Sequence, residues 1–137
     1  GNPRRVAVGF EHNRLSMLLA ILHRHGGLQV GDQDVFVNAV GGIRIDETSS
    51  DLALILAVVS SFRNRALPLD LVCFGEVGLS GEIRPVPNGQ ERIREAAKHG
   101  FRIAMVPEGN KPRQQVSGMK VILVRKLGDV LAALEEL

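Results

Sequence analysis

Aromatic side chains are scarce, because the 137 residues include five phenylalanines and neither tryptophan nor tyrosine. Proteins that bind single-stranded nucleic acid without sequence preference usually stack successive bases on aromatic side chains. This composition offers little material for such a platform. We therefore expect any nucleic-acid contact to be made by basic side chains with the phosphate backbone.

The net charge is also small. Seventeen basic residues against fifteen acidic ones leave +2, which by itself does not indicate a nucleic-acid partner. Arginine nevertheless outnumbers lysine thirteen to four. Arginine suits bidentate contacts with carboxylate or phosphate groups, and it suits a solvated surface equally well.

Cysteine and long apolar runs are nearly absent. The single cysteine, Cys73, cannot form an internal disulfide and lies in an apolar run, so we expect a buried thiol and a reducing compartment. No stretch of about 18 apolar residues and no secretory signal pattern is present. These observations predict a cytoplasmic protein with no membrane partner.

The length predicts one domain, residues 1–137, because domains commonly contain about 100–200 residues. We find no internal repeat and no linker-like segment. The sequence begins Gly1-Asn2-Pro3 rather than with methionine. We therefore expect a module excised from a longer protein.

Hydrophobic periodicity predicts strands with interspersed helices. The predicted strands are 5–10, 34–40, 70–77, 82–86, 103–106 and 121–124, and the predicted helices are 15–22, 52–62, 90–99 and 130–137. Strands 70–77 and 82–86 should form a hairpin through the Gly78–Gly81 turn. The order predicts an α+β fold with a two-layer mixed sheet and helices.

Few residues are arranged for chemistry. His23 and His25 point to different sides of a predicted helix, so no metal site is expected. The glycines at 75, 78 and 81 match no phosphate-binding pattern and fit a tight hairpin. Ser49 lies at the start of a buried helix, where a nucleophile could be placed, although capping serines are far commoner there. A serine nucleophile would also need a base, and no lysine is obviously placed to provide one.

Three segments carry a family resemblance: Asp46–Ala53, Phe74–Val86 and Val106–Asn110. In this order they resemble the motifs of the Lon protease proteolytic domain over nearly the whole chain. The segment FGEVGLSGEIRPV, followed by QERIREAAKHG, is similar to the C-terminal Lon-like domain of the RadA (Sms) family of bacterial DNA repair and recombination ATPases.

The Lon family uses a Ser–Lys dyad, and the resemblance places the serine at Ser49 and the lysine position at Gln90. A carboxamide cannot accept the hydroxyl proton at neutral pH, and Asp51 would bring negative charge near an oxyanion. Lys98 is eight residues further along the same predicted helix and is a poor substitute. We expect no catalytic residues, with Ser49 and Gln90 as degenerate dyad positions. The alternative is an active serine peptidase with Ser49 as nucleophile and a non-standard base.

Basic residues around helix 90–99 are candidates for DNA contact. They are Arg92, Arg94, Lys98, Arg102, Lys111 and Arg113. Glu91 and Glu95 alternate with them, so a solvated helix crossed by ion pairs is an equally good interpretation. Arg63 and Arg65 form a second, smaller basic cluster.

The resemblance implies a non-proteolytic scaffold and DNA-handling domain of a DNA-dependent ATPase that acts in recombinational repair and branch migration. It implies a homohexamer, single-stranded or branched DNA, and a RecA-type recombinase as partners. It implies no cofactor in this domain, with ATP and Mg and a structural Zn bound by N-terminal parts outside these residues.

Overall fold

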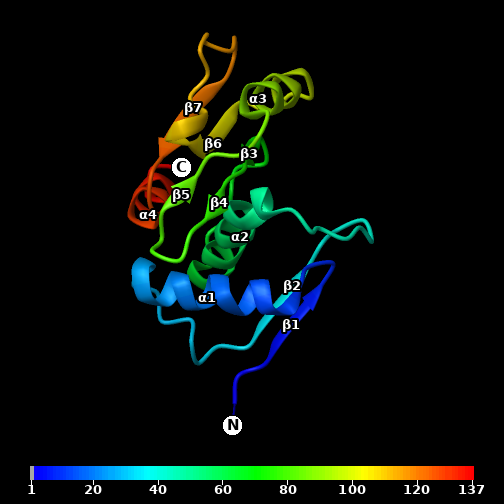
Figure 1. Ribbon diagram of the computed structural model, residues 1–137, viewed down its shortest axis with the longest axis vertical. Helices are drawn as coiled ribbons and strands as arrows, with labels where there is room; N and C mark the ends of the chain where they lie inside the picture. Colours follow the sequence, from blue (N-terminus) through cyan, green and yellow to red (C-terminus); the bar gives the residue numbers. More distant parts are fainter. Residues whose placement is uncertain (1) are drawn as a thin grey trace.

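The computed structural model describes residues 2–137, so the domain boundary expected at Gly1 lies outside the described residues. Residues 2–137 form four α-helices and seven short strands, and Figure 1 shows the helices interspersed among the strands. In chain order the elements are β1 (Arg5–Val8), α1 (His12–Gly26), β2 (Val35–Asn38), the 3₁₀ turn η1 (Thr48–Ser50), α2 (Asp51–Arg63), β3 (Leu71–Cys73), β4 (Glu76–Val77), β5 (Ile83–Arg84), α3 (Gly89–Lys98), β6 (Ile103–Pro107), the 3₁₀ turn η2 (Glu108–Asn110), β7 (Lys120–Val124) and α4 (Leu127–Glu135).

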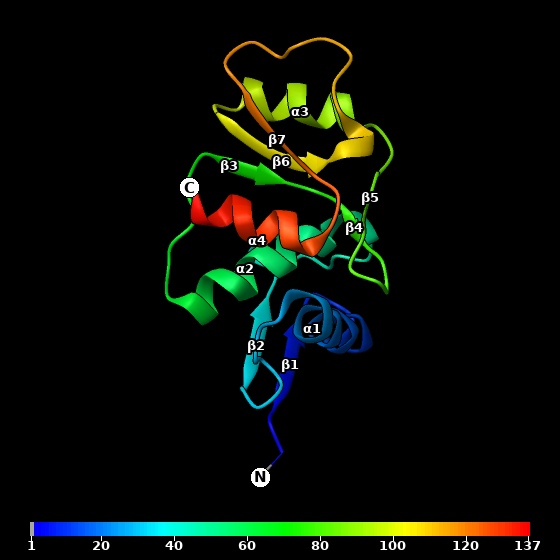
Figure 2. The same ribbon diagram turned by 90° about the vertical axis from the view of Figure 1, so that its left-hand side faces the viewer.

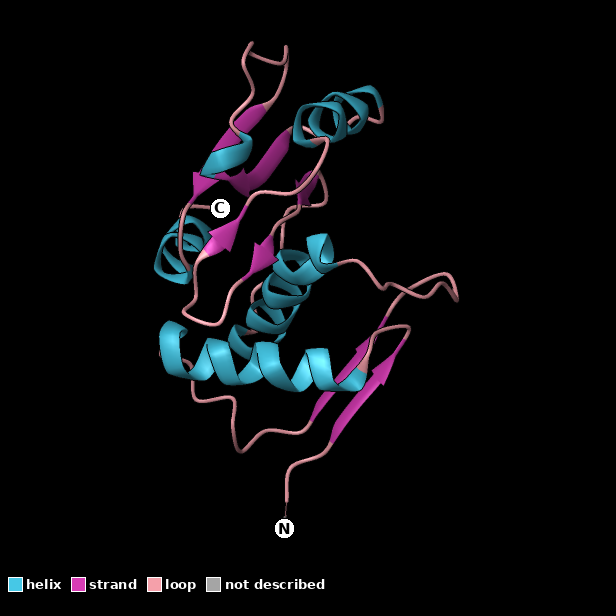
Figure 3. Cartoon of the chain, viewed as in Figure 1, coloured by secondary structure: helices cyan, strands magenta, loops and turns pink. Residues whose placement is uncertain are grey.

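Three small sheets replace the predicted two-layer mixed sheet. β1 and β2 form a parallel pair, β3, β6 and β7 form a parallel sheet in the order 3-6-7, and β4 and β5 form an antiparallel hairpin. The mixture of helices and strands is the one that an α+β fold requires, as Figure 3 shows. The prediction of a two-layer mixed sheet was wrong, because the strands form three separate small sheets.

The predicted strand 70–77 is divided because the backbone turns at Gly75, where φ is +153°, a value that favours glycine. The Gly75 amide donates to the Ser49 carbonyl at 2.9 Å instead of joining a strand ladder. β3 therefore pairs with β6, whereas β4 pairs with β5. The predicted hairpin is confirmed, with Glu76 opposite Arg84 and Val77 opposite Ile83.

The β3–β6–β7 sheet separates two hydrophobic cores. Figure 2 shows α3 on one side of this sheet and α2 with α4 on the other. Side chains alternate along β6, so that Ala104 and Val106 contact the α3 side while Met105 joins the larger core. Both cores are largely aliphatic, with Phe74 buried in the smaller one, and we attribute most of the folding free energy to them.

Helices α1 and α2 differ in how they are buried. The carboxylate of Glu11 accepts hydrogen bonds from the Asn13 and Arg14 amides and caps α1, while Gly27 ends it at φ +71°. α2 is apolar on most faces and packs in the same core as α1 and α4, as predicted for a helix of the interior. No helix within residues 2–137 has both the length and the apolar character needed to cross a membrane.

Candidate functional site

Ser49 lies in η1, the 3₁₀ turn that leads into α2, and is 8% exposed. Its Oγ donates a hydrogen bond to Glu47 Oε2 at 3.1 Å. The helix-capping role considered for this serine is not observed, since Ser50 occupies the N-cap position without a side-chain capping bond. The Ser49 hydroxyl therefore forms a hydrogen bond with a carboxylate and does not cap the free amides at the start of the helix.

Glu47 also connects this turn to helix α3. The same oxygen, Glu47 Oε2, lies 3.8 Å from Arg92 Nη2. Gln90, at the lysine position, is half-buried in the first turn of the same helix. The structure thus links the Ser49 turn to the first turn of α3 through an acidic side chain and a guanidinium. The other lysine considered, Lys98, lies exposed in the last turn of α3, 4.0 Å from Glu95.

This arrangement holds a hydroxyl in place but leaves it without a free base. Gln90 cannot take up a proton at neutral pH. Glu47 receives the hydrogen of Ser49, and the same carboxylate oxygen faces the Arg92 guanidinium. A neighbouring cavity of about 190 Å³ is lined by Glu47, Thr48 and Ser50 but not by Ser49.

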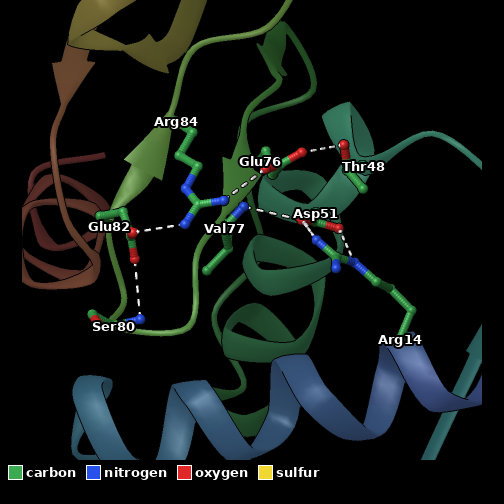
Figure 4. A network of polar contacts seen from close by, with 8 residues as sticks. All are labelled: Arg14, Thr48, Asp51, Glu76, Val77, Ser80, Glu82 and Arg84. Atoms are coloured by element: carbon green, nitrogen blue, oxygen red, sulfur yellow. Dashed lines mark hydrogen bonds and ion pairs between the residues drawn. The ribbon is translucent and has the colours of Figure 1, made fainter.

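A buried ion pair anchors the start of α2. Asp51 is 3% exposed, and its carboxylate accepts hydrogen bonds from both Nε and Nη2 of Arg14 on α1, the Nε contact being 2.9 Å. The Val77 amide donates to the same carboxylate at 3.0 Å. The hydrogen bond with Asp51 raises the pKa of Arg14 above its usual range. Figure 4 shows that these contacts join α1, α2 and β4 at one point.

A second network of polar side chains connects η1 to the β4–β5 hairpin (Figure 4). The Thr48 hydroxyl donates to Glu76, and Arg84 Nη1 donates to the other oxygen of Glu76 at 3.2 Å. Arg84 also binds Glu82 at 3.0 Å. The Thr48 hydrogen bond, supported by Arg84, lowers the pKa of Glu76. Sequence reasoning missed this network, in which the observed hairpin register places Glu76 opposite Arg84.

The DNA-contact candidate Arg92 is occupied within its own chain. In addition to facing Glu47, its Nε donates to the Pro87 carbonyl at 2.9 Å. Its guanidinium carbon lies 5.7 Å from the centre of the Phe74 ring, a distance typical of cation–π contact. These contacts give Arg92 a structural role in joining α3 to the rest of the molecule.

The other candidates gather at the end of the molecule opposite the N-terminus. Figures 1 and 2 both place α3 beside the connection between β6 and β7, and Val116 and Met119 of that connection pack into the α3 core. Within residues 2–137, no carboxylate lies within ion-pair distance of four exposed side chains: Arg94, Arg102, Lys111 and Arg113.

The second basic cluster has a different environment. Arg63 and Arg65 both contact Glu135, and Arg65 also donates to the Leu137 carbonyl at 2.8 Å. They join the end of α2 to the end of α4. In the part of the chain that the structure describes, no group of three or more His, Cys, Asp or Glu side chains is arranged to hold a metal ion.

The sequence of this chain is similar to those of known DNA repair proteins. The chain is 71% identical over 136 residues to the DNA repair protein RadA of Haemophilus influenzae, covering 99% of this chain and 30% of that protein. It is 67% identical to the RadA protein of Escherichia coli with the same coverage, and 42% identical to that of Bacillus subtilis, covering 96% of this chain and 29% of the relative. The chain thus spans about 30% of the length of these relatives.

A family model also matches most of the chain. The model is ChlI, described as subunit ChlI of Mg-chelatase, and it matches residues 5–110. That range contains Ser49, Gln90 and the two polar networks that surround η1. The chain matches DNA repair proteins named RadA over almost its whole length, and by the model that covers residues 5–110 it belongs to the ChlI family.

Proposed function

We propose that this chain is a Lon-protease-like, non-proteolytic module of a RadA-type DNA repair protein. In that protein it serves as the scaffold of a homohexamer and handles single-stranded or branched DNA during recombinational repair and branch migration. The observation that carries this proposal is the 71% identity over 136 residues to a protein named DNA repair protein RadA. The proposed location is the cytoplasm.

The geometry at Ser49 supports the non-proteolytic part of the proposal. A serine nucleophile needs a base that can take its proton as the oxygen attacks. The side chain at position 90 is a carboxamide, and the Ser49 hydrogen is committed to Glu47, whose charge faces Arg92. Every buried side-chain nitrogen and oxygen within residues 2–137 has a hydrogen-bond partner, which is typical of a polar cluster with a structural role.

ATP with Mg and a structural Zn belong to the same proposal but not to these residues. The glycines at 75, 78 and 81 form a hairpin turn rather than a phosphate-binding loop, and residues 2–137 provide no metal-binding cluster. The residues described therefore do not fit either group. We assign both groups to other parts of the longer protein, with a RecA-type recombinase as its protein partner.

For DNA contact we favour the exposed cations without ion-pair partners over the full set of candidates. Arg94 belongs to α3 and Arg113 to the β6–β7 connection, and these two segments lie at the same end of the molecule (Figures 1 and 2). Such side chains bind phosphates without the cost of breaking an existing ion pair. Arg92 would have to leave Glu47, the Pro87 carbonyl and the Phe74 ring.

The test is the salt dependence of binding to a labelled single-stranded oligonucleotide and to a forked duplex. Each neutralised phosphate contributes about 0.7 to 0.9 to the slope of log K against log salt. The double variant Arg94→Ala with Arg113→Ala should therefore bind more weakly, and its slope should be smaller by about 1.4 to 1.8. The matched control is Arg24→Ala with Arg44→Ala, which removes the same charge elsewhere on the surface. Equal slopes for the two double variants would contradict the assignment.

A serine peptidase remains the second candidate, because the Ser49 hydroxyl does donate to a carboxylate at 3.1 Å. If Glu47 acted as the base, the wild-type chain would cleave an unfolded protein substrate. Both Ser49→Ala and Glu47→Gln would abolish that cleavage, while Thr48→Ala would retain most of it. We expect no cleavage by the wild-type chain at any pH between 6 and 9. Cleavage that depends on Ser49 would overturn the non-proteolytic assignment.

A further inference from the structure

The sheet formed by β1 and β2 is covered on one face only. Side chains alternate between the two faces along each strand. Val35 and Val37 of β2 pack against the larger core. Val6, Val8 and Phe36 point to the opposite face, where they are exposed, and the pairing register places Val6 opposite Phe36. We call the surface formed by Val6, Val8 and Phe36 the outer face of this sheet.

Exposed apolar side chains are concentrated in this part of the molecule. Of the eight large apolar side chains that are exposed within residues 2–137, five belong to β1, β2 or the loop after β2, which contributes Val40 and Ile43. Figures 1 and 2 both place β1 and β2 at the end of the molecule that carries the N-terminus, away from α3. A group of neighbouring exposed apolar side chains on a folded protein commonly marks an interaction surface.

The residues that lead into β1 are held against this sheet. The Arg4 amide donates to the Asp34 carboxylate at 2.7 Å, and the Arg4 carbonyl accepts the Val35 amide at 2.8 Å. The guanidinium carbon of Arg4 lies 5.3 Å from the centre of the Phe36 ring, a distance typical of cation–π contact. Whatever precedes Arg4 in a longer chain is therefore attached directly beside the outer face.

The amount of chain outside these residues is large. The chain spans about 30% of the length of its RadA relatives, so more than twice as many residues lie outside it as within it. A part that is joined to β1 reaches the outer face at a high effective concentration, because the covalent connection makes the contact intramolecular. A separate protein would have to lose its translational and rotational freedom to bind the same surface. The connection therefore favours a part of the same chain as the occupant.

We infer that the part of the longer chain that immediately precedes Asn2 folds against the outer face, with Val6, Val8 and Phe36 at the centre of the contact. This inference rests on the proposed function, in which the chain is one module of a longer protein, and it adds the surface that joins this module to the rest. The covering surface is apolar at its centre. At its rim it offers a carboxylate or carbonyl to Arg4, whose side chain is 71% exposed and makes its ion pair with Asp34 at 3.6 Å.

The first test is photo-cross-linking in the full-length protein, with the photo-reactive analogue benzoylphenylalanine in place of Phe36. Irradiation should link position 36 to a peptide well before Asn2, identified by mass spectrometry, and the product should keep the mass of one chain on a denaturing gel. The control carries the analogue in place of Leu69, which is fully exposed in the connection from α2 to β3, and should give no such link. Links from position 36 only within residues 2–137, or to a second chain or another protein, would overturn the inference.

The second test measures accessibility in the intact full-length protein. Val8→Cys should react with a maleimide several-fold more slowly than Leu69→Cys, although Val8 is 56% exposed in the module itself. Adding Phe36→Asp, which places a charge in the contact, should raise the Val8→Cys rate to that of Leu69→Cys. Adding Leu79→Asp, in the exposed turn of the β4–β5 hairpin, should leave it low. Rates are read for each peptide by mass spectrometry, and burial raises the pKa of the native Cys73 thiol to about 12, so this residue should react slowly.

The outcomes separate this inference from the proposed function. Equal labelling rates for Val8→Cys and Leu69→Cys, together with a smaller salt slope for Arg94→Ala with Arg113→Ala, would overturn the covered face and retain the proposed DNA contact. Slow labelling of Val8→Cys, together with an unchanged salt slope, would support the covered face and contradict the DNA contact. Circular dichroism should show that each variant is folded.

Discussion

Asp51 is the residue whose replacement should affect folding most directly near the site. Its carboxylate binds Arg14 through two nitrogens and accepts the Val77 amide at 3.0 Å. Asp51→Ala removes all three hydrogen bonds. The Val77 amide, on a residue that is 2% exposed, would then lack an acceptor.

The magnitude follows from the surroundings of the two partners. Removing one member of a buried ion pair costs about 3–5 kcal/mol, because the remaining charge is left uncompensated. The Arg14 side chain is 29% exposed and can recover part of its hydration, so the lower end of this range applies. We expect Asp51→Ala to lower the free energy of unfolding by about 3 kcal/mol. Asp51→Asn retains an acceptor for Val77 and should cost roughly half as much.

Urea unfolding followed by far-UV circular dichroism measures this difference. With a slope of about 2 kcal/mol per molar urea, the Asp51→Ala midpoint should fall by about 1.5 M. Asp46→Ala is the matched control, because Asp46 pairs with Arg44 in the open and both side chains are more than half exposed. Exposed pairs contribute about 0–1 kcal/mol. An Asp51→Ala midpoint within error of that control would refute the role given to the buried pair.

Two further predictions concern acid stability and close packing. The folded-state pKa of Glu76 is lowered, mainly by the hydrogen bond from the Thr48 hydroxyl. The stability that ionised Glu76 contributes is therefore fully present above pH 4.5, the ordinary pKa of a glutamate, and is lost as the pH falls through the lower folded-state pKa. Glu76→Gln should therefore flatten the loss of stability in urea titrations between pH 6 and pH 3, and an unchanged acid limb would contradict this. A Cβ at Gly89 would lie 2.5 Å from the Asn110 side chain, which binds the Val86 backbone twice, so Gly89→Ala should lower the thermal midpoint. Gly128→Ala, in an open helical position of α4, should instead raise stability by about 0.5–1 kcal/mol, and equal effects of the two substitutions would argue against the close contact at Gly89.

The helices could be predicted from the sequence because each one is marked by apolar residues within its own segment, repeated over several turns. The apolar residues of α1 repeat every three or four positions until Gly26 and Gly27, and the observed helix covers residues 12–26. α3 begins and ends within one residue of the predicted range 90–99. Apolar residues that recur every three or four positions over several turns indicate a helix with one buried face, and this pattern does not depend on what the face packs against.

The sheet could not be predicted in the same way, because strand pairing depends on distant residues. The apolar segment 70–77 has the composition of one buried strand, yet the Ser49 carbonyl binds the Gly75 amide and ends the first part of it. A residue 26 positions earlier in the chain thus decides where β3 stops. Nothing in the composition of 70–77 records that contact.

The same distinction separates the predicted site residues from the observed ones. The family resemblance assigns Ser49 and Gln90 to the site by their order along the chain, and that assignment stays a prediction. The contact between Glu47 and Arg92 could not be predicted, because it depends on how η1 approaches α3. The electrostatic character of the site comes from those partners, and it requires the three-dimensional structure.

The polar residues around η1 have one common effect, which is to fix this turn against its neighbours. Ser49 reaches α3 through Glu47 and Arg92, Thr48 reaches the hairpin through Glu76, and Asp51 reaches α1 through Arg14. A nucleophile must be free to exchange its proton with a base during each turnover. Side chains that join separate elements lose stabilising contacts when they move. Substitutions at these positions should therefore change the unfolding free energy and the placement of α3, and with it the geometry of the cations proposed to contact DNA.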